Sequence, residues 1–474
     1  MSRLKNFARG VVSGYVQMAA NILFTMASVP LALHYLSKEE FGIWALVTQI
    51  AGYLALIDLG MAVSVGRILA DYKDDRDGGS YGAVLKCGQI VFSLQAALIG
   101  AVSFALAPWL AELFAIGPTL RGDFIFLVRA QGFVTAFYFV TKVLSAPFWC
   151  HQRHDVTNYS AAAGFAFSFV VLWVGFACGF GIKSMLAGQA VALLVTTAWA
   201  GIAGRRLELF PRRGAWGEVD GKILRELLHF GRDIFLMAVG VQLLSASQLI
   251  IIARTLGLDA AATWAICSKT FTLAQQAVGR IYENSSAAFV EMAVRGEHER
   301  LKNRFRDIVA LSASLAVVVG VVGAASNGAF VEIWTRGRVA WPLLNDVLMA
   351  ATLVVFCVAR CHTGNVAVDK QVRTMRFVHL FEGITFFVLA WLAALPFGLP
   401  GIAAAGLVAT ALWSGVFGFA RSRTYFRASL RELFGWLAPS ARLAGLILPV
   451  AAVLWWTTRD WAAWPRLLTT GLGT

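Results

Sequence analysis

Runs of about 20 apolar residues recur along the whole of this 474-residue chain. A helix of that length crosses the hydrocarbon core of a bilayer, whereas a barrel strand alternates apolar and polar residues over about ten positions, which these runs do not. Because 58% of the residues are apolar and only 14% are charged, one soluble core cannot bury the apolar surface. We therefore predict an all-α polytopic membrane protein. The predicted spans are residues 10–35, 41–60, 84–110, 123–148, 156–180, 183–203, 233–254, 260–282, 308–333, 344–366, 376–396, 400–420 and 440–457.

The C-terminal tail and the basic residues complete the predicted topology. Residues 461–474 are too short to cross a membrane alone, so we expect an interfacial segment or the remnant of a fourteenth helix. Loops rich in Lys and Arg stay in the cytoplasm, and most of the 41 basic residues fall in one set of alternate loops. This asymmetry predicts a cytoplasmic N-terminus. The net charge of +14 then reflects topology and contact with anionic lipid, and nucleic-acid binding is not expected.

Two stretches about 220 residues apart read alike, which indicates an internal duplication. Each has a basic collar, a long apolar run, a short acidic turn and a second apolar run with an early Trp, in residues 7–44 and 230–264. Amphipathic segments at 224–228 and 430–434 are expected to lie on the inner leaflet. We predict two six-helix lobes and about one extra C-terminal helix. The boundaries are residues 1–203, a cytoplasmic linker at 204–232, residues 233–420, and a final part at 421–474.

The first hairpin carries a family resemblance. Phe-Gly-Ile-Trp-Ala-Leu at 41–46, then Leu-Ala-Leu-Ile-Asp-Leu-Gly-Met-Ala at 54–62 and Arg67, resemble the start of bacterial polysaccharide-exporting flippases. These are the O-antigen and exopolysaccharide branch of the multidrug/oligosaccharidyl-lipid/polysaccharide (MOP) superfamily. Residues 291–301 resemble the inner loop after helix eight of the same family.

The resemblance implies a multi-pass protein of the bacterial inner membrane that is not an enzyme. It implies movement of an oligosaccharide linked to a carrier of the undecaprenyl pyrophosphate type, by alternating access of two lobes, for cell-surface polysaccharide assembly. The implied partners are membrane lipids, a polysaccharide polymerase and glycosyltransferases. The alternative is a cation-coupled exporter of small molecules or drugs on the same scaffold. A membrane enzyme acting on the same carrier is disfavoured, because every predicted outer loop is shorter than about 20 residues.

When basic residues near a span end are counted with the adjoining loop, four lie within predicted spans, where a charged side chain at mid-depth costs about 2.5–3.5 kcal/mol. Lys269 is near the middle of helix eight, and Arg280 follows on the same predicted polar stripe. Arg129 either faces the substrate path or extends to the outer interface. Arg360 lies at the polar end of helix ten. These cations are the predicted ligands of an anionic substrate phosphate, although an internal ion pair is the alternative for several of them.

Small polar groups and two acids complete the predicted site. Gln17, Asn21, Gln242 and Gln276 could line the substrate path or form interhelical hydrogen bonds, which are worth about 0.6 kcal/mol on average in membranes. Two acids are the candidates for ion coupling, Asp58 and Glu283. The alternative for Asp58 is to cap the segment that follows it, and that for Glu283 is to pair with the arginine one turn before it.

No other chemistry is supported by the sequence. Cys357 and Cys361 are spaced i, i+4, but no second pair of ligands stands nearby, so no metal site is expected. No phosphate-binding Walker loop occurs, so we expect no hydrolysis of ATP and no cofactor.

Overall fold

The computed structural model describes residues 3–151, 153–368 and 372–473, and within these ranges every regular element is helical. Eleven helical segments of the described chain are long and apolar enough to cross a membrane. The chain divides into two compact units, Met1–Ala238 and Val239–Thr474. The prediction of an all-helical membrane protein is confirmed.

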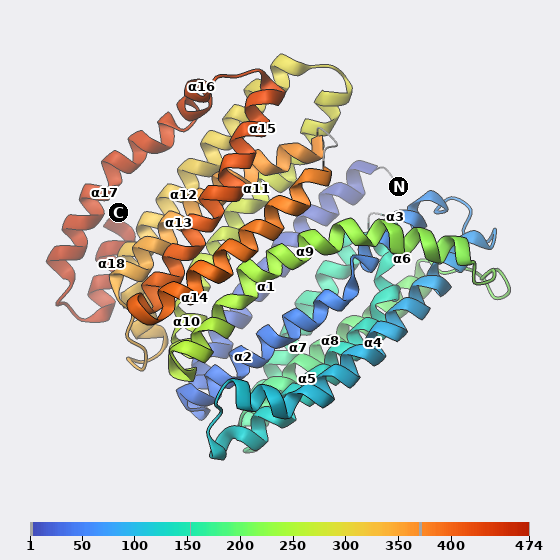
Figure 1. The fold of residues 1–474 in the computed structure, drawn as a ribbon, viewed down its shortest axis with the longest axis horizontal. Helices are drawn as coiled ribbons and strands as arrows, with labels where there is room; N and C mark the ends of the chain where they lie inside the picture. Colours follow the sequence, from blue (N-terminus) through green and yellow to red (C-terminus); the bar gives the residue numbers. More distant parts are fainter. Residues whose placement is uncertain (1–2, 152, 369–371, 474) are drawn as a thin grey trace. The chain divides into compact units, whose positions relative to one another are not determined.

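The first unit consists of long helices joined by short turns. Helix α7 packs against α1 and α8, while α4 packs against α5 (Figure 1). Short elements interrupt the second and fourth spans, because η1 follows α2, and η2 and α6 follow α5. The elements are α1 (Arg3–Tyr35), α2 (Lys38–Leu54), η1 (Ala55–Asp58), α3 (Met61–Asp71), α4 (Ser80–Leu113), α5 (Pro118–Thr141), η2 (Lys142–Ser145), α6 (Ala146–Cys150), α7 (His154–Ala177) and α8 (Lys183–Arg206).

Helix α9 (Gly221–Thr255) leads from the first unit into the second. In the second unit α12 packs against α11, α13, α17 and α18, and α13 also packs against α14 and α15 (Figure 1). The elements that follow α9 are α10 (Leu258–Cys267), α11 (Lys269–Val294), α12 (His298–Trp334), α13 (Leu343–Val368), α14 (Val372–Thr410), the π-helix η3 (Ala411–Gly415), α15 (Val416–Phe426), α16 (Leu430–Gly435), α17 (Ala438–Thr458) and α18 (Ala463–Gly473).

The thirteen predicted spans and the eleven apolar segments differ at two places. Residues 258–294, which contain the predicted span 260–282, form α10 and α11, and these two helices meet at Ser268. Because α11 carries several polar residues, this part of the chain is not among the eleven apolar segments. The segment Thr374–Phe426 contains two predicted spans, because α14 reverses at Gly398, whose φ of 61° and ψ of −143° are accessible to glycine. The indole of Trp413 donates to the hydroxyl of Thr385 at 2.8 Å, so the two limbs run antiparallel.

The two predicted copies begin with the same helix, turn and helix, although different residues make the turns. Ser37 caps α2, since its hydroxyl accepts from the backbone N–H of Glu40 at 3.1 Å and the Glu40 carboxylate accepts from the Ser37 N–H at 2.7 Å. Gly257, with φ of 90°, precedes α10 in the second unit. Spans one and two of each unit therefore follow one another through a tight turn.

The linker after α8 packs on the first unit. Lys86 donates to the backbone carbonyl of Gly217 at 2.7 Å, and the Tyr81 hydroxyl donates to that of Leu209 at 3.1 Å. The predicted amphipathic segment at 224–228 forms the early turns of α9, and Leu227 is fully buried against the α3 and α4 core. Leu224 is half-buried and Leu228 is exposed, so only part of this apolar face packs on protein, and its position on the inner leaflet stays a prediction.

The other predicted amphipathic segment is α16, and the C-terminal tail contains a further helix. The Ser429 hydroxyl caps α16 by accepting from the backbone N–H of Glu432 at 3.1 Å. Leu433 is buried, whereas Leu430 and Phe434 are exposed. Helix α18 packs against α12 and α17, so the tail predicted as an interfacial segment or helix remnant is a short packed helix.

Candidate substrate-binding surface

Helix α11 carries a line of exposed polar side chains. Lys269, Thr272, Gln276, Arg280 and Glu283 are all exposed and follow one another at intervals of three or four residues. That spacing places them on one face of the helix. Among the residues of this helix whose burial the structure describes, the buried ones are apolar or aromatic, namely Phe271, Val278, Tyr282 and Phe289. We call the five exposed residues the α11 stripe.

An ion-pair network joins the α11 stripe to α13. A guanidinium nitrogen of Arg280 lies 3.3 Å from one carboxylate oxygen of Glu283, and a guanidinium nitrogen of Arg360 lies 3.3 Å from the other. All three side chains are between 42% and 55% exposed, so a ligand can reach them. Two guanidinium groups share one carboxylate, and with Lys269 the surface carries three cations and one anion. Its charge therefore suits an anionic ligand.

A buried polar network supports the junction of α10 and α11, where the stripe begins. The Asn327 side-chain amide donates to the Cys267 carbonyl at 3.3 Å and to the Asp346 carboxylate at 2.6 Å. Thr270 donates to the Asn327 side-chain oxygen at 2.8 Å, and the Trp341 indole donates to Asp346 at 2.7 Å. Asp346 is only 1% exposed. The network satisfies a carbonyl at the helix break and holds the first turn of α11 in place.

This network was not predicted from the sequence. Asn327 and Asp346 are 19 residues apart in the chain and come from α12 and α13. The sequence did contain a sign of the network, because Asn327 and Asp346 lie in apolar runs. A polar side chain in such a run of a membrane protein usually has a specific partner.

Asp58 belongs to the first unit, where it lies at the break between η1 and α3. Its carboxylate oxygens accept from the Lys142 ammonium at 2.8 Å and from the backbone N–H of Ala62 at 3.3 Å. The Gln95 amide donates to its backbone carbonyl at 3.1 Å. Leu59 and Gly60 then adopt left-handed conformations before α3 begins. The structure thus gives Asp58 the predicted capping contact, together with an ion pair that the sequence analysis did not identify.

The remaining predicted residues are distributed between the units. Arg129 of α5 stacks on the Phe104 ring, with 4.1 Å from the guanidinium carbon to the ring centre, and its Nε donates to the Phe104 carbonyl at 3.3 Å. Gln17 and Asn21 are half-buried on α1, and Gln242 is half-buried on α9. The second unit therefore brings together five predicted residues, namely Lys269, Gln276, Arg280, Glu283 and Arg360.

A second ionisable cluster lies in the hairpin of the second unit. Glu382 of α14 is 2% exposed, accepts a hydrogen bond from Ser414 of η3, and lies 3.4 Å from a ring nitrogen of His379. A π-helix within an apolar span often marks a functional site, and buried ionisable groups in membranes usually do so. Glu382 was not predicted from the sequence, because its partner Ser414 lies 32 residues away in the chain.

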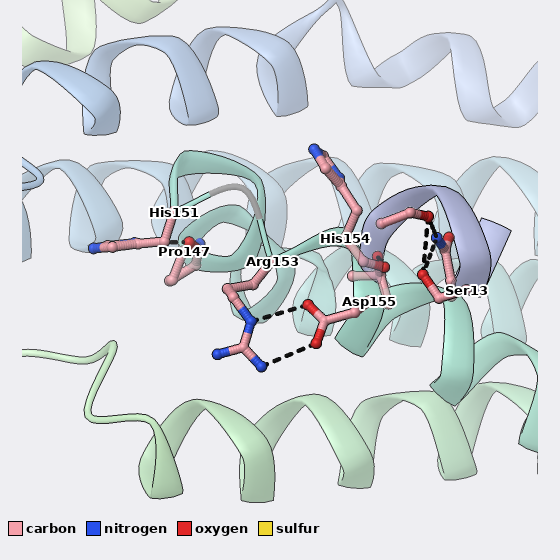
Figure 2. A network of polar contacts seen from close by, with 9 residues as sticks. Ser13, Pro147, His151, Arg153, His154 and Asp155 are labelled. Carbon is pink, nitrogen blue, oxygen red and sulfur yellow. Dashed lines mark hydrogen bonds and ion pairs between the residues drawn. The ribbon is translucent and has the colours of Figure 1, made fainter. Parts of the chain in front are cut away.

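The first unit contains a further polar network at the start of α7 (Figure 2). Arg153 donates two hydrogen bonds to the Asp155 carboxylate, at 2.9 and 3.0 Å, and this contact raises the pKa of Arg153. The Asn158 amide donates to the Ser13 hydroxyl of α1 at 3.0 Å. The ring of His154 points away from the ion pair (Figure 2). No predicted site residue belongs to this network, which fastens α1 to α7.

Metal chemistry has no support in the described part of the chain. No group of three His, Cys, Asp or Glu side chains there could hold a metal ion. All six cysteines are free thiols, including Cys357 and Cys361.

These features define a multi-pass, all-helical membrane protein with two units, and its fold is that of the MOP superfamily. The solved structure of a lipid II flippase, MurJ, in an inward closed conformation matches with a TM-score of 0.71 and 11% identity, covering 98% of this chain and 96% of that one. An inward-facing multidrug resistance MATE transporter matches with a TM-score of 0.65 and 15% identity, covering 88% and 99%. A MOP transporter from Pyrococcus furiosus matches with a TM-score of 0.66 and 11% identity, covering 90% and 96%.

The sequence assigns the family within this class. The family of polysaccharide biosynthesis proteins matches residues 7–286, more than half of the chain, so the protein belongs to that family. No curated protein matches the chain in sequence. The expected membership of the polysaccharide branch and the expected two-lobe helical fold are both confirmed.

Proposed function

We propose that the protein is a flippase that moves a polyprenyl-pyrophosphate-linked oligosaccharide across the bacterial inner membrane. The observation that carries the proposal is the exposed cationic surface formed by the α11 stripe and Arg360. Membership of the polysaccharide biosynthesis family and the structural likeness to a lipid II flippase support a lipid-linked sugar as cargo. The protein acts by binding and conformational change, not as an enzyme.

The cations of this surface are proposed to hold the pyrophosphate. Guanidinium groups bind phosphate oxygens through paired hydrogen bonds, and ammonium groups act as point charges. Glu283 accepts hydrogen bonds from Arg280 and Arg360. A pyrophosphate carries more negative charge than one carboxylate and therefore displaces Glu283 from the two guanidiniums. Lys269, at the other end of the stripe, contacts the same head group.

The amides are proposed to bind sugar hydroxyls. Gln276 lies on the α11 stripe, and Gln242 is half-buried on α9. Gln17, Asn21 and Arg129 belong to the first unit, and we propose that they also bind the cargo. The lipid tail stays in the bilayer while the lobes open alternately to either side.

Three acids are candidates for coupling to a cation gradient. Asp58 and Glu283 each contact a permanent cation already, namely Lys142 in one case and two arginines in the other. A coupling ion must compete with those cations. Glu382 contacts the titratable His379 and a hydroxyl, so it can exchange a proton or bind a cation without breaking such a pair. We therefore favour Glu382 for this role.

Orientation and partners follow from the same proposal. We place the N-terminus in the cytoplasm, because most Lys and Arg lie in the loops on that side. A polymerase and glycosyltransferases that use the same carrier are the expected partners.

The second candidate function is cation-coupled export of small molecules, which the likeness to MATE transporters favours. An exporter of cationic drugs would need an acidic binding surface, whereas three cations and one anion meet at the α11 stripe and Arg360. The charge of this surface therefore favours the flippase.

The test is transport in sealed vesicles that hold a fluorescent polyprenyl-pyrophosphate oligosaccharide. We expect outward movement by the wild type and a loss of at least tenfold in Lys269→Gln and in Arg280→Gln/Arg360→Gln, since each phosphate contact contributes about 1.5–3 kcal/mol. Arg306→Gln is the matched control, because Arg306 is an exposed, ion-paired arginine of α12 outside the surface. Undiminished transport in both site variants would exclude this surface as the phosphate site. Transport of a cationic dye with no transport of the lipid-linked sugar would establish the exporter instead.

A further inference from the structure

A large cavity opens beside α13 near the end of α15. Its volume is about 1130 Å³, which exceeds the range of roughly 300–1,000 Å³ usual for small-molecule sites. Val354, Val358 and Phe419 form part of its apolar wall, and Arg423 and Arg427 lie at its polar end. The apolar segment Thr374–Phe426 ends there, as does α15. The cavity thus has an apolar part between membrane-spanning helices and a cationic part at the end of one of them.

The two arginines are available to a ligand. Arg423 and Arg427 are both exposed, and neither makes an ion pair with another described residue. No acidic side chain lines the cavity among the residues that the structure describes. The nearby Glu432 is engaged elsewhere, because it pairs with Lys302 of α12 at 2.8 Å. Charge complementarity therefore calls for an anion.

The backbone at Arg427, which ends α15, adopts a conformation that glycine usually occupies. Its φ of 49° and ψ of 36° lie in the left-handed region, where the residue after a helix is usually glycine. A non-glycine residue there is strained, and the same strain occurs at four other helix ends, after Asp58, Phe114, Leu207 and Thr335, so it does not by itself mark a ligand site. Glycine at this position would relieve the strain but would remove the guanidinium from the cavity mouth.

The apolar part continues past α13 into a second cavity of about 670 Å³. Val354 and Val355 line both cavities, so the two adjoin along α13. Every side chain that lines the second cavity is apolar or aromatic, and α17 contributes Trp455 and Trp456 to it. Water gains no hydrogen bonds from such walls, whereas hydrocarbon chains fill them favourably. The ligand therefore combines an anionic head with long apolar chains.

We propose that this composite cavity binds one anionic glycerophospholipid of the membrane. Arg423 and Arg427 hold its phosphate, one acyl chain lies along α13 in the larger cavity, and the other passes into the cavity beside α17. The exposed Leu430 and Phe434 of the amphipathic α16 lie at the same end and fit a position in the bilayer interface. The site is separate from the α11 stripe and does not depend on the transport proposal.

The test is native mass spectrometry of the purified full-length protein with phosphatidylglycerol and phosphatidylcholine. We expect a preference for phosphatidylglycerol that weakens about thirtyfold in Arg423→Gln/Arg427→Gln, which corresponds to about 1 kcal/mol for each arginine. Arg431→Gln is the matched control, because Arg431 is exposed on α16 but does not line the cavity. Val355→Trp fills the junction of the cavities and should weaken the binding of both lipids.

Each other outcome overturns the proposal. Unchanged phosphatidylglycerol binding in the double arginine variant would remove the head-group site, and unchanged binding in Val355→Trp would remove the acyl-chain path. A polyprenyl phosphate that displaces phosphatidylglycerol at equal concentration would assign the cavity to the carrier lipid instead. Thermal unfolding of each variant checks that the fold is retained.

Discussion

The ion pair of Asp58 and Lys142 yields a quantitative prediction about the first unit. Their charged atoms lie 2.8 Å apart, and the side chains are 18% and 14% exposed. At an effective dielectric constant of about 20, Coulomb's law gives an attraction of about 6 kcal/mol, which the lost hydration of both groups largely offsets. Exposed pairs contribute about 0.2–1 kcal/mol, and removing one partner of a buried pair costs about 3–5 kcal/mol.

The intermediate exposure of this pair places its coupling energy between those limits, at about 1–3 kcal/mol. Lys142→Met alone should cost about 3 kcal/mol of unfolding free energy, because it leaves a poorly hydrated carboxylate. Asp58→Asn/Lys142→Met should recover much of that loss. Equilibrium unfolding in mixed micelles, analysed as a double-mutant cycle, measures the coupling energy.

The control cycle uses Arg67 and Asp71 of α3, whose charged atoms are 2.6 Å apart with side chains 53% and 55% exposed. Its coupling energy should not exceed about 1 kcal/mol, because solvent screens the pair. The reasoning is refuted if the Asp58 cycle gives the same small value as this control. Loss of the ion dependence of transport in Asp58→Asn, with no coupling to Lys142, would instead assign ion coupling to Asp58.

Three further predictions concern other polar contacts. Asn327→Ala should destabilise the fold by about 1–3 kcal/mol, because it leaves the buried Asp346 short of a donor; an unfolding midpoint equal to that of the wild type would contradict this. Glu382→Gln should retain substrate binding but abolish the dependence of flipping on pH or sodium, measured with imposed gradients, and persistence of that dependence would exclude the residue. The backbone N–H of Arg212 donates to Asp77 and lowers the pKa of that carboxyl, so the contact stabilises the loop at neutral pH and is lost as the pH falls below about 4. The protection of the amides of residues 207–220, corrected for the intrinsic pH dependence of amide exchange, should therefore fall between pH 6 and pH 3 in the wild type and not in Asp77→Asn, and equal profiles would count against the contact.

The predicted positions of the spans agree with the structure because they depend on local composition. A segment that crosses lipid must satisfy its own backbone hydrogen bonds, so a run of about 20 apolar residues can be little other than a helix. The α11 stripe was predictable for a related reason, since spacing of three and four residues places side chains on one helical face wherever that helix lies. The hairpin of α14 was also predicted as two spans, 376–396 and 400–420, and the structure places the reversal between them at Gly398.

The partners of the polar residues were decided by tertiary structure. Asp58 meets Lys142 across 84 positions of the chain, and Glu283 meets Arg360 across 77. The buried Asn327 and Asp346 come together only where α12 packs on α13. The sequence by itself determined which segments enter the membrane and which residues carry charge there, because hydrophobic transfer and helical periodicity act locally. Helix packing decided which charges neutralise one another and which remain exposed to a ligand, because contacts between distant helices depend on the shapes of all the side chains between them.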